Sequence, residues 1–192
     1  MDYLSLSFFN HVLFCVALYL ILYNVYMLVF NKGVPNIRTA PGIRKKIIAL
    51  LKADMAARNL PAYTIVDMGS GNGLLTRKIA AALPDAKVVG LEISKQSVAW
   101  ANMMKKRQKL DNLEYICTDF NAYDFSNVSA VVVFLSIYEM GMMGKLLNEK
   151  LKPGTLITSN RFKLGDGWQV KEHFKVFTLY PFQKNLYLYE KR

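Results

Sequence analysis

The sequence predicts an α/β domain built on a mostly parallel sheet and preceded by one transmembrane helix. Two observations indicate the sheet: an apolar, β-branched run at 64–67 leads into a glycine-rich turn, and a second buried run at 88–91 is followed by an acid. The helix is indicated by residues 3–31, which contain no Asp, Glu, Lys or Arg. A chain of 192 residues is long enough for one such domain and a small appendage.

The first predicted element, at 3–31, is a membrane anchor. From Phe8 to Phe30 the side chains are almost all apolar or aromatic, and 23 residues rise about 34 Å as a helix, enough to cross a hydrocarbon core of roughly 30 Å. Asn10, His11 and Asn24 are strongly polar and lie toward the ends. A cleaved signal peptide would have a basic amino-terminal region and a small-residue cleavage site, and this segment has neither. We therefore expect a retained single-pass anchor.

Basic residues follow the anchor, and none precedes it in the sequence. They are Lys32, Arg38, Arg44, Lys45, Lys46 and Lys52. By the positive-inside rule the domain that follows the anchor is expected to be cytoplasmic at a bacterial inner membrane, which we favour, or matrix-facing at a mitochondrial inner membrane. The same cluster favours an anionic lipid surface, at about 1 kcal/mol per basic residue. It explains much of the net charge of +11 without nucleic acid.

Residues 32–62 are expected to form a connector and an amphipathic helix. Two prolines make 33–41 an extended segment. Apolar residues then recur at helical spacing, opposite a basic side, at Ile43, Ile47, Leu50, Leu51 and Met55. This helix is expected to cover the first strand, and the connector and helix are also a candidate lid facing the membrane.

Residues 63–192 are expected to form the sheet domain. The predicted strands are 64–67, 88–91, 115–119, 130–135, 155–160, 171–180 and 184–189, the last two forming an antiparallel hairpin that turns at 181–183. Helices are predicted at 74–83 and from the loop after 135 to about 151. Only about ten residues separate the fifth strand from the hairpin, too few for a further helix. One face of the sheet is therefore expected to be thin, or covered by the helix at 43–55 or by a second subunit.

The glycine-rich turn indicates the kind of ligand. Its glycines alternate with other residues directly after Asp67, whereas a dinucleotide fold spaces them as G-x-G-x-x-G so that a helix end meets the pyrophosphate. The alternating pattern suits a ligand with an amino group and no phosphate. Glu92 follows the second strand, and an acid at that place accepts hydrogen bonds from both ribose hydroxyls.

These features resemble the seven-stranded, Rossmann-like methyltransferases that use S-adenosyl-L-methionine. The resemblance implies that Asp67 and the glycine turn hold the methionine part of this cofactor and that Glu92 holds its ribose. It also implies that Asp119, after the third strand, binds the adenine amino group beside an apolar residue. The implied cofactor-binding residues are Asp67, Gly69, Ser70, Gly71, Gly73, Glu92, Ile93, Asp119 and Phe120.

A narrower resemblance covers nearly the whole chain. The anchor, the proline-containing connector and the glycine turn are followed by Met142-Met143, Arg161-Phe162 and Trp168. This combination is similar to the membrane-anchored lysine methyltransferases of ATP synthase subunit c and the adenine nucleotide translocator, with their bacterial relatives. It implies a membrane protein substrate methylated on lysine. The sequence departs from the family pattern at Asn72, Leu74, Ser94 and Tyr138-Glu139, which leaves the methyl acceptor open.

The loop after the fourth strand is expected to receive the methyl acceptor. Tyr138 and Glu139 are the candidate catalytic residues: either can accept a hydrogen bond from an amine, and Glu139 can take its proton. Met142, Phe162 and Trp168 are candidates for the wall of the same site. Each has a structural alternative, since Glu139 suits the first turn of a helix, Met142 suits a core, and Trp168 suits a cap on the sheet.

Other functions remain as alternatives. The first alternative is a methyltransferase whose acceptor is a lipid or an amphipathic small molecule, since a membrane anchor suits such a substrate equally well. RNA is a weaker alternative that draws on the basic run at 105–109, and no nucleic acid is expected. The last alternative is a non-catalytic binding protein. The sequence does not indicate an oligomeric state.

The cysteines and histidines predict neither a disulfide nor a metal site. Cys15 and Cys117 both lie in apolar runs, so we expect two buried thiols. His11 and His173 are far apart and lack the spacing of metal ligands, so no metal is expected.

Overall fold

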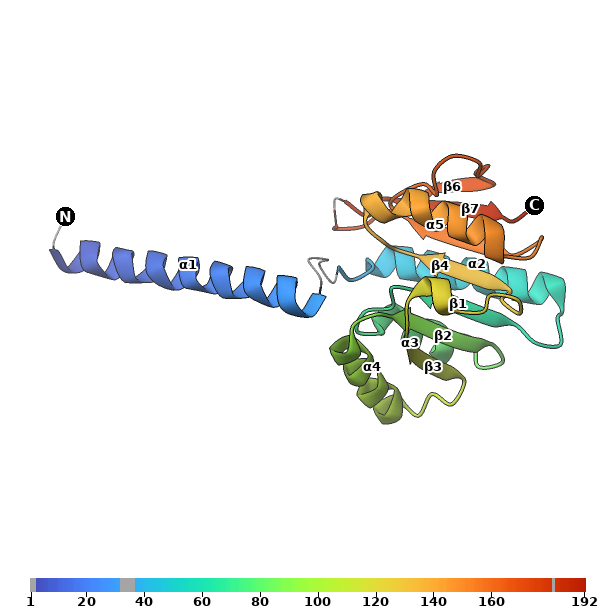
Figure 1. Cartoon of the computed structure of the whole chain (residues 1–192), viewed down its shortest axis with the longest axis horizontal. Coiled ribbons are helices and arrows are strands. Elements are labelled where there is room, and N and C mark those ends of the chain that lie inside the picture. Colours follow the sequence, from blue (N-terminus) through green and yellow to red (C-terminus); the bar gives the residue numbers. More distant parts are fainter. Residues whose placement is uncertain (1–2, 32–36, 181) are drawn as a thin grey trace. The chain divides into compact units, whose positions relative to one another are not determined.

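The computed structural model divides the chain into two units, residues 1–37 and 38–192. It describes residues 3–31, 37–180 and 182–192 (Figure 1). The start of the predicted connector, at 32–36, and Pro181 in the predicted turn of the hairpin lie outside the described residues.

The first unit contains one described element, helix α1 (Tyr3–Asn31). Its segment Ser7–Val25, 19 residues with a mean hydropathy of 1.8, is long and apolar enough to cross a membrane. Two polar side chains bond to the backbone of the same helix: His11 Nδ1 lies 2.7 Å from the Ser7 carbonyl oxygen, and Asn24 donates to Leu20 at 2.7 Å. Such pairing lowers the free energy of transferring a polar group to hydrocarbon.

The second unit is a seven-stranded mixed sheet with the strand order β3-β2-β1-β4-β5-β7-β6 (Figure 1). Strands β1 to β5 pair in parallel, and β7 runs antiparallel to both β5 and β6. The predicted fold class is therefore confirmed. The strands are β1 (Thr64–Met68), β2 (Lys87–Glu92), β3 (Leu113–Cys117), β4 (Ala130–Val133), β5 (Leu156–Asn160), β6 (Glu172–Lys175) and β7 (Asn185–Glu190).

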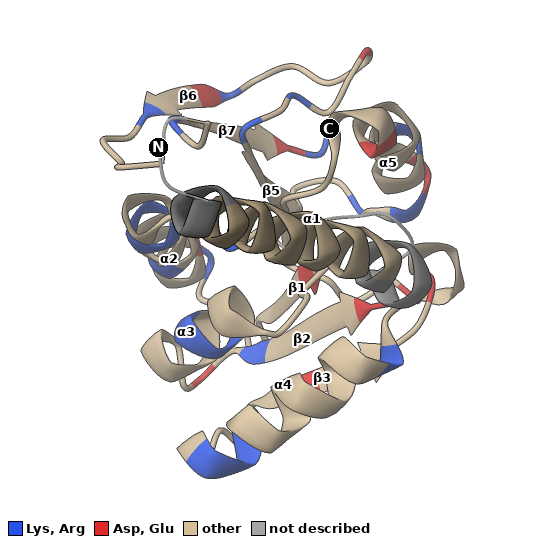
Figure 2. Ribbon diagram, turned by 90° about the vertical axis from the view of Figure 1, so that its left-hand side faces the viewer, with Lys and Arg blue, Asp and Glu red and all other residues tan. Residues whose placement is uncertain are grey.

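Helices cover the two faces of this sheet unequally (Figure 2). One face packs against α2 (Pro41–Arg58), α3 (Leu74–Ala82) and α4 (Lys95–Gln108), which share one apolar core with it. Ile43, Ile47 and Leu51 point into that core, as the helical spacing predicts. The other face packs against a single helix, α5 (Ile137–Lys150).

Loop residues complete the cover beside α5. Phe125, Val128 and Leu164 are buried in the same core as this helix. The indole of Trp168 donates to the Gly144 carbonyl of α5 at 2.8 Å, and its ring meets that of Tyr189 edge to face at 6.0 Å between centroids. Loops and one tryptophan thus take the place of the missing last helix.

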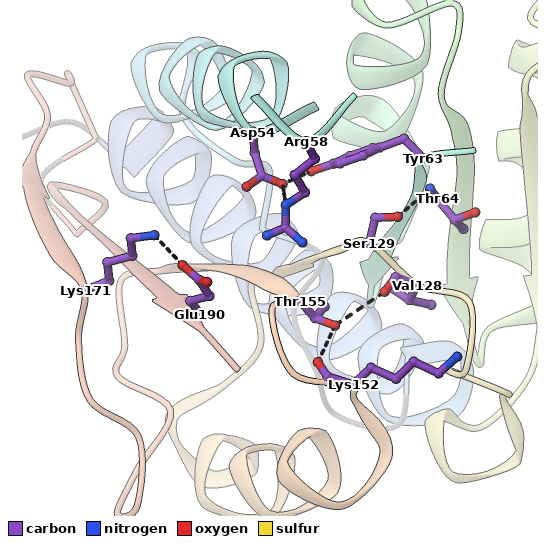
Figure 3. A network of polar contacts seen from close by, with 10 residues as sticks. All are labelled: Asp54, Arg58, Tyr63, Thr64, Val128, Ser129, Lys152, Thr155, Lys171 and Glu190. Carbon is purple, nitrogen blue, oxygen red and sulfur yellow. Dashed lines mark hydrogen bonds and ion pairs between the residues drawn. The ribbon is translucent and has the colours of Figure 1, made fainter. Parts of the chain in front are cut away.

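The amino-terminal edge of the sheet is closed by polar contacts (Figure 3). The Tyr63 hydroxyl donates to Asp54 Oδ2 at 2.5 Å, and Arg58 Nε lies 2.8 Å from the same oxygen. These contacts tie the end of α2 to the start of β1. Ser129 Oγ accepts from the Thr64 amide at 3.2 Å and ties β4 to β1 at the same edge.

Several sequence predictions are wrong in detail. The third strand spans 113–117 instead of 115–119, so Asp119 lies two residues beyond it, and the fourth ends at Val133 instead of 135. The sixth strand ends at Lys175 instead of 180, because it is an edge strand with one neighbour and the chain leaves the sheet after Val176 donates to Lys184. Cys117 is exposed, because it is the last residue of the opposite edge strand, β3. Cys15 is exposed as well, since α1 is the single element described in its unit.

Candidate active site

The carboxyl ends of the parallel strands share one edge of the sheet, and the loops that follow them carry the predicted site residues. The loop after β1 folds back toward β2: the amides of Gly69 and Ser70 both donate to the Leu91 carbonyl, at 3.0 and 2.9 Å. Gly69, Gly71 and Gly73 have φ angles of +72°, +53° and +73°. Because residues with a Cβ rarely adopt such angles, the alternating glycines permit this turn.

Tyr115, which sequence reasoning missed, supports the glycine turn from β3. Its hydroxyl donates to the Gly73 carbonyl at 3.0 Å, and a Cβ on Gly90 would lie 2.6 Å from the ring. Gly90 and Tyr115 are paired in the register of β2 and β3. A glycine inside an otherwise β-branched strand was the available signal, because it marks a place where a bulky neighbour approaches the backbone.

Glu92 is held in a fixed orientation by two backbone amides. Its Oε2 accepts from Gly71 and its Oε1 from Ser94, both at 2.9 Å. A carboxylate has about four acceptor positions, so each oxygen retains capacity for one more donor. Two hydroxyls on neighbouring carbons of a ribose match this requirement.

Asp67 lies beneath the turn and is 3% exposed. Its Oδ2 accepts from the Thr76 hydroxyl at 2.6 Å. Burial raises the pKa of Asp67 to about 7; the Thr76 hydrogen bond opposes the rise, and the nearby charge of Glu92 adds to it. Asp67 therefore shapes the floor of the turn and titrates near neutral pH.

Two polar side chains in and under the turn are incompletely paired. Among the described residues, the buried Ser70 Oγ and Arg77 Nε have no hydrogen-bond partner. Arg77 is otherwise anchored, because its Nη1 donates to the Asn72 carbonyl at 2.7 Å. The Ser70 hydroxyl lies against β2, because a Cβ on Gly90 would be 2.9 Å from its oxygen.

The residues of the predicted adenine site follow β2 and β3. Asp119 Oδ1 accepts from the backbone and side-chain amides of Asn121, each at 2.8 Å, and begins the one-turn helix η1 (Phe120–Ala122). Ile93 directly follows Glu92 and is 47% exposed. Phe120 is half-buried. The structure thus places Ile93, Asp119 and Phe120 on adjacent loops at the same edge of the sheet.

The two candidate catalytic residues begin α5. Tyr138 is 93% exposed. Glu139 Oε2 accepts from the hydroxyl and the amide of Ser136, at 2.8 and 3.2 Å, which closes the first turn of the helix. Met142, one turn further, is exposed and is not a core residue. A structural role for Glu139 is therefore present in the fold, and Tyr138 and Met142 face outward.

The other two candidates for the acceptor wall, Phe162 and Trp168, lie in different parts of the domain. Phe162 is half-buried near the end of β5, with the Arg161 guanidinium 4.6 Å from its ring centroid. Trp168 instead covers the sheet beside α5, through its contacts with Gly144 and Tyr189. In the described part of the chain no three His, Cys, Asp or Glu side chains are grouped as a metal site would require.

The comparisons with solved structures give the fold. An RNA methyltransferase from Salinibacter ruber, in complex with S-adenosyl-L-homocysteine, is 23% identical with a TM-score of 0.65 and covers 80% of this chain and 93% of its own. An O-methyltransferase from Bacillus cereus also has a TM-score of 0.65, at 13% identity, over 84% of this chain and 86% of its own.

The sequence comparisons give the family. A protein-lysine N-methyltransferase of Saccharolobus islandicus (strain REY15A) is 28% identical over 145 residues, which are 74% of this chain and 87% of that protein. The family model of the ANTKMT methyltransferase domain matches residues 67–172, more than half of the chain. The matched region begins at Asp67 and contains the glycine turn, Glu92 and Asp119. The chain therefore belongs to the ANTKMT methyltransferase domain family and is an S-adenosylmethionine-dependent methyltransferase.

Proposed function

We propose that this protein is a membrane-anchored protein-lysine N-methyltransferase whose substrate is a membrane protein. The observation that carries the proposal is the combination, in one chain, of an ANTKMT-family domain with an apolar helix long enough to span a bilayer. The lysine acceptor is supported by the Saccharolobus islandicus relative, which is named a protein-lysine N-methyltransferase. Tethering raises the effective concentration of membrane-bound substrates and leaves that of soluble ones unchanged.

The proposed cofactor contacts follow the geometry of the loops. Glu92 accepts from the ribose hydroxyls with the capacity that Gly71 and Ser94 leave on its oxygens. Gly69, Ser70, Gly71 and Gly73 form the turn beside the methionine part, with Asp67 beneath it. Ile93 and Phe120 flank the adenine, and Asp119 accepts from its amino group. The support is that all of these residues lie at the carboxyl ends of β1 and β2 or on the loops after β1, β2 and β3, at one edge of the sheet.

When bound, S-adenosylmethionine would supply a methyl group on a sulfonium. An uncharged lysine nitrogen would attack that methyl carbon in line, forming a C–N bond as the C–S bond breaks and the sulfur leaves as a thioether. The remaining task of the protein is to align the acceptor and to favour its neutral form. Tyr138 and Glu139 are the proposed groups that receive the lysine amine, since both lie at the start of α5 beside the carboxyl end of β4. Glu139 would exchange its bond to Ser136 for one to the amine.

The orientation of the protein is also part of the proposal. Arg38, Arg44, Lys45, Lys46 and Lys52 follow α1, and α2 carries several of them (Figure 2). By the positive-inside rule the methyltransferase domain lies in the cytoplasm of a bacterium, or in the matrix of a mitochondrion. The basic residues of α4 support RNA binding poorly. Lys105, Lys106 and Arg107 form its last turn, where cations favourably oppose the helix dipole, at the edge away from the site.

The experiment is label transfer from radioactive S-adenosylmethionine to native membranes, followed by separation into protein, lipid and aqueous fractions. We expect label in a membrane protein, recovered as methyl-lysine, from the full-length enzyme and much less from Glu92→Gln. Label in the lipid or aqueous fraction would replace the proposal with the small-molecule alternative. Cofactor binding without any transfer would support the non-catalytic alternative.

A further inference from the structure

The segment 176–182, between β6 and β7, exposes apolar side chains that no aqueous role explains. Phe177 is 90% and Leu179 is 89% exposed, and Phe182 is 69% exposed. Single apolar residues are common on protein surfaces, but a cluster within six residues marks an interaction site. We call the described residues 176–180 and 182 the hairpin loop.

The hairpin loop has a defined conformation. Val176 donates to the Lys184 carbonyl at 2.8 Å, Tyr180 to Thr178 Oγ1 at 3.0 Å, and Gln183 to the Tyr180 carbonyl at 3.0 Å. The inward-facing Val176 and Thr178 alternate with the outward-facing Phe177 and Leu179. The fold thus pairs polar groups of the loop internally and presents its apolar side chains to the exterior.

Cationic side chains surround this cluster. Lys175 precedes the loop and Lys184 follows it, and both are exposed. The guanidinium of Arg161, which follows β5, lies 5.5 Å from the ring centroid of Phe182. Aromatic residues flanked by Lys and Arg match the chemistry of a bilayer interface with anionic headgroups, where rings sit at headgroup level and cations meet phosphates.

The start of the domain is attached to the same loop. Gln183 accepts from the Ala40 amide at 2.7 Å and donates to the Arg38 carbonyl at 2.8 Å, and a Cβ on Gly42 would lie 2.7 Å from the Phe177 carbonyl oxygen. In the sequence only residues 32–37 separate Arg38 from the end of α1, a stretch that reaches at most about 25 Å when extended. The loop is therefore tethered within reach of any membrane that α1 spans.

The hairpin loop also lies at the catalytic edge of the sheet. Because β6 runs parallel to β5, both end at the edge where β1, β2 and β4 end. In Figure 1 the connection between β6 and β7 is on the same side of the domain as the start of α5. The Arg161 amide donates to the Asn185 carbonyl at 2.8 Å, which joins the end of β5 to the start of β7.

We infer that the hairpin loop is a second membrane contact, which inserts Phe177, Leu179 and Phe182 into the bilayer interface and turns the methyltransferase edge toward the membrane surface. This inference rests on the proposed role of α1 as an anchor. It restricts the acceptors of this enzyme to amines held close to the headgroups, such as a lysine at the membrane boundary of a transmembrane protein.

The test is depth-dependent quenching of a fluorophore by lipids that carry a quencher. The full-length protein with Cys15→Ser and Cys117→Ser is labelled at Leu179→Cys and reconstituted in vesicles of phosphatidylcholine and phosphatidylglycerol. The matched control is Asp85→Cys, an exposed position in the turn before β2 at the opposite edge of the sheet. We expect at least about twofold quenching at 179 and none at 85, and loss of the quenching at 179 when phosphatidylglycerol is omitted at high salt.

Extraction at alkaline pH separates this inference from the anchor itself. A protein that stays in the membrane with position 179 unquenched would overturn the loop contact and leave the anchor intact. Release of the protein by alkali would overturn both. If the fluorophore at position 179 is shielded from solvent in native membranes but not in vesicles of pure lipid, the loop would bind a protein partner instead of the bilayer. In the supporting case, Phe177→Ser/Leu179→Ser/Phe182→Ser should keep cofactor affinity and lose about tenfold in transfer to native membranes.

Discussion

Tyr115 and Gly73 hold the glycine turn against β3, two strands away from β1: the Tyr115 hydroxyl donates to the Gly73 carbonyl at 3.0 Å, and a Cβ on Gly73 would lie 2.1 Å from the same hydroxyl oxygen. The contact is possible because Gly73 lacks a side chain and has a φ of +73°. Burial, the largest of several influences, raises the pKa of Tyr115 to about 12, so its hydroxyl stays a donor at neutral pH.

Gly73→Ala is therefore expected to disrupt the turn. The new methyl group would overlap Tyr115, and the residue would retain an unfavourable φ, which together cost at least about 2 kcal/mol. Chemical denaturation should show this loss of stability, and calorimetry should show loss of S-adenosylmethionine binding.

Gly141→Ala is the control, because an added Cβ there meets nothing within 4 Å. In an exposed helical position it should stabilise by about 0.5 kcal/mol. Normal cofactor affinity in Gly73→Ala would contradict the role of the turn.

Glu92→Gln should weaken cofactor binding by about 10- to 100-fold, the range for losing hydrogen bonds to a charged acceptor. Both oxygens of Glu92 accept from backbone amides, and the amide group of glutamine can replace only one of them. Isothermal titration of S-adenosylmethionine measures the change. Glu114→Gln is a suitable control, since that carboxylate is exposed and lies 3.4 Å from Lys87 away from the turn. Equal affinities of Glu92→Gln and the parent would remove Glu92 from the ribose site.

Asp67 should make folding stability depend on pH. Its pKa is about 7 in the folded protein and about 3.9 when unfolded, so between these values the folded state binds more protons. Stability should therefore fall as pH rises from 5 to 7, with a slope of at most about 1.4 kcal/mol per pH unit. In Asp67→Asn, which keeps an acceptor for Thr76, the fall should be much smaller. Denaturation of both proteins across this range is the measurement, and parallel curves would contradict the assignment.

Trp168→Phe should affect stability and leave cofactor affinity unchanged. The substitution removes the indole donor to Gly144, at a cost of about 1 kcal/mol, and retains an aromatic ring beside Tyr189. Denaturation and cofactor titration should be compared with Trp100→Phe, whose side chain is half exposed on α4. A loss of methyl transfer in Trp168→Phe at unchanged stability would return this residue to the acceptor wall.

The sequence could predict the sheet and the glycine turn because their signals are local. Each β-branched run, the row of alternating glycines, and the second strand with its acid is a pattern of a few adjacent residues. Residues 176–180 show the limit of such patterns. Their apolar and β-branched character predicted a strand, but Phe177 and Leu179 point outward on a loop. Local propensity does not distinguish a strand at the edge of a sheet from a loop that leaves it.

The contacts that sequence reasoning missed join distant parts of the chain. Tyr115 and Gly73 are 42 residues apart, and Gln183 and Ala40 are 143 residues apart. Neither pair belongs to a periodic pattern, and each depends on the register of strands that only the folded sheet brings together. The sequence left Trp168 between the acceptor wall and a cap on the sheet for the same reason: its partner Gly144 lies on α5, 24 residues earlier in the chain.

Gln183→Ala should loosen the start of the domain. Gln183 is 2% exposed, and its oxygen accepts from Ala40 at 2.7 Å and from Asn160 Nδ2 at 3.2 Å. Removing this side chain leaves the buried Ala40 amide without its acceptor, at a cost of about 1 to 3 kcal/mol for each unpaired group. Denaturation should show the loss of stability, and limited proteolysis should cut the chain sooner near Arg38.

Gln169→Ala is the control. At this exposed position the substitution should change stability by no more than about 0.5 kcal/mol. Unchanged proteolysis near Arg38 in Gln183→Ala would show that other contacts, such as those of Gly42 with the hairpin loop, hold the chain there.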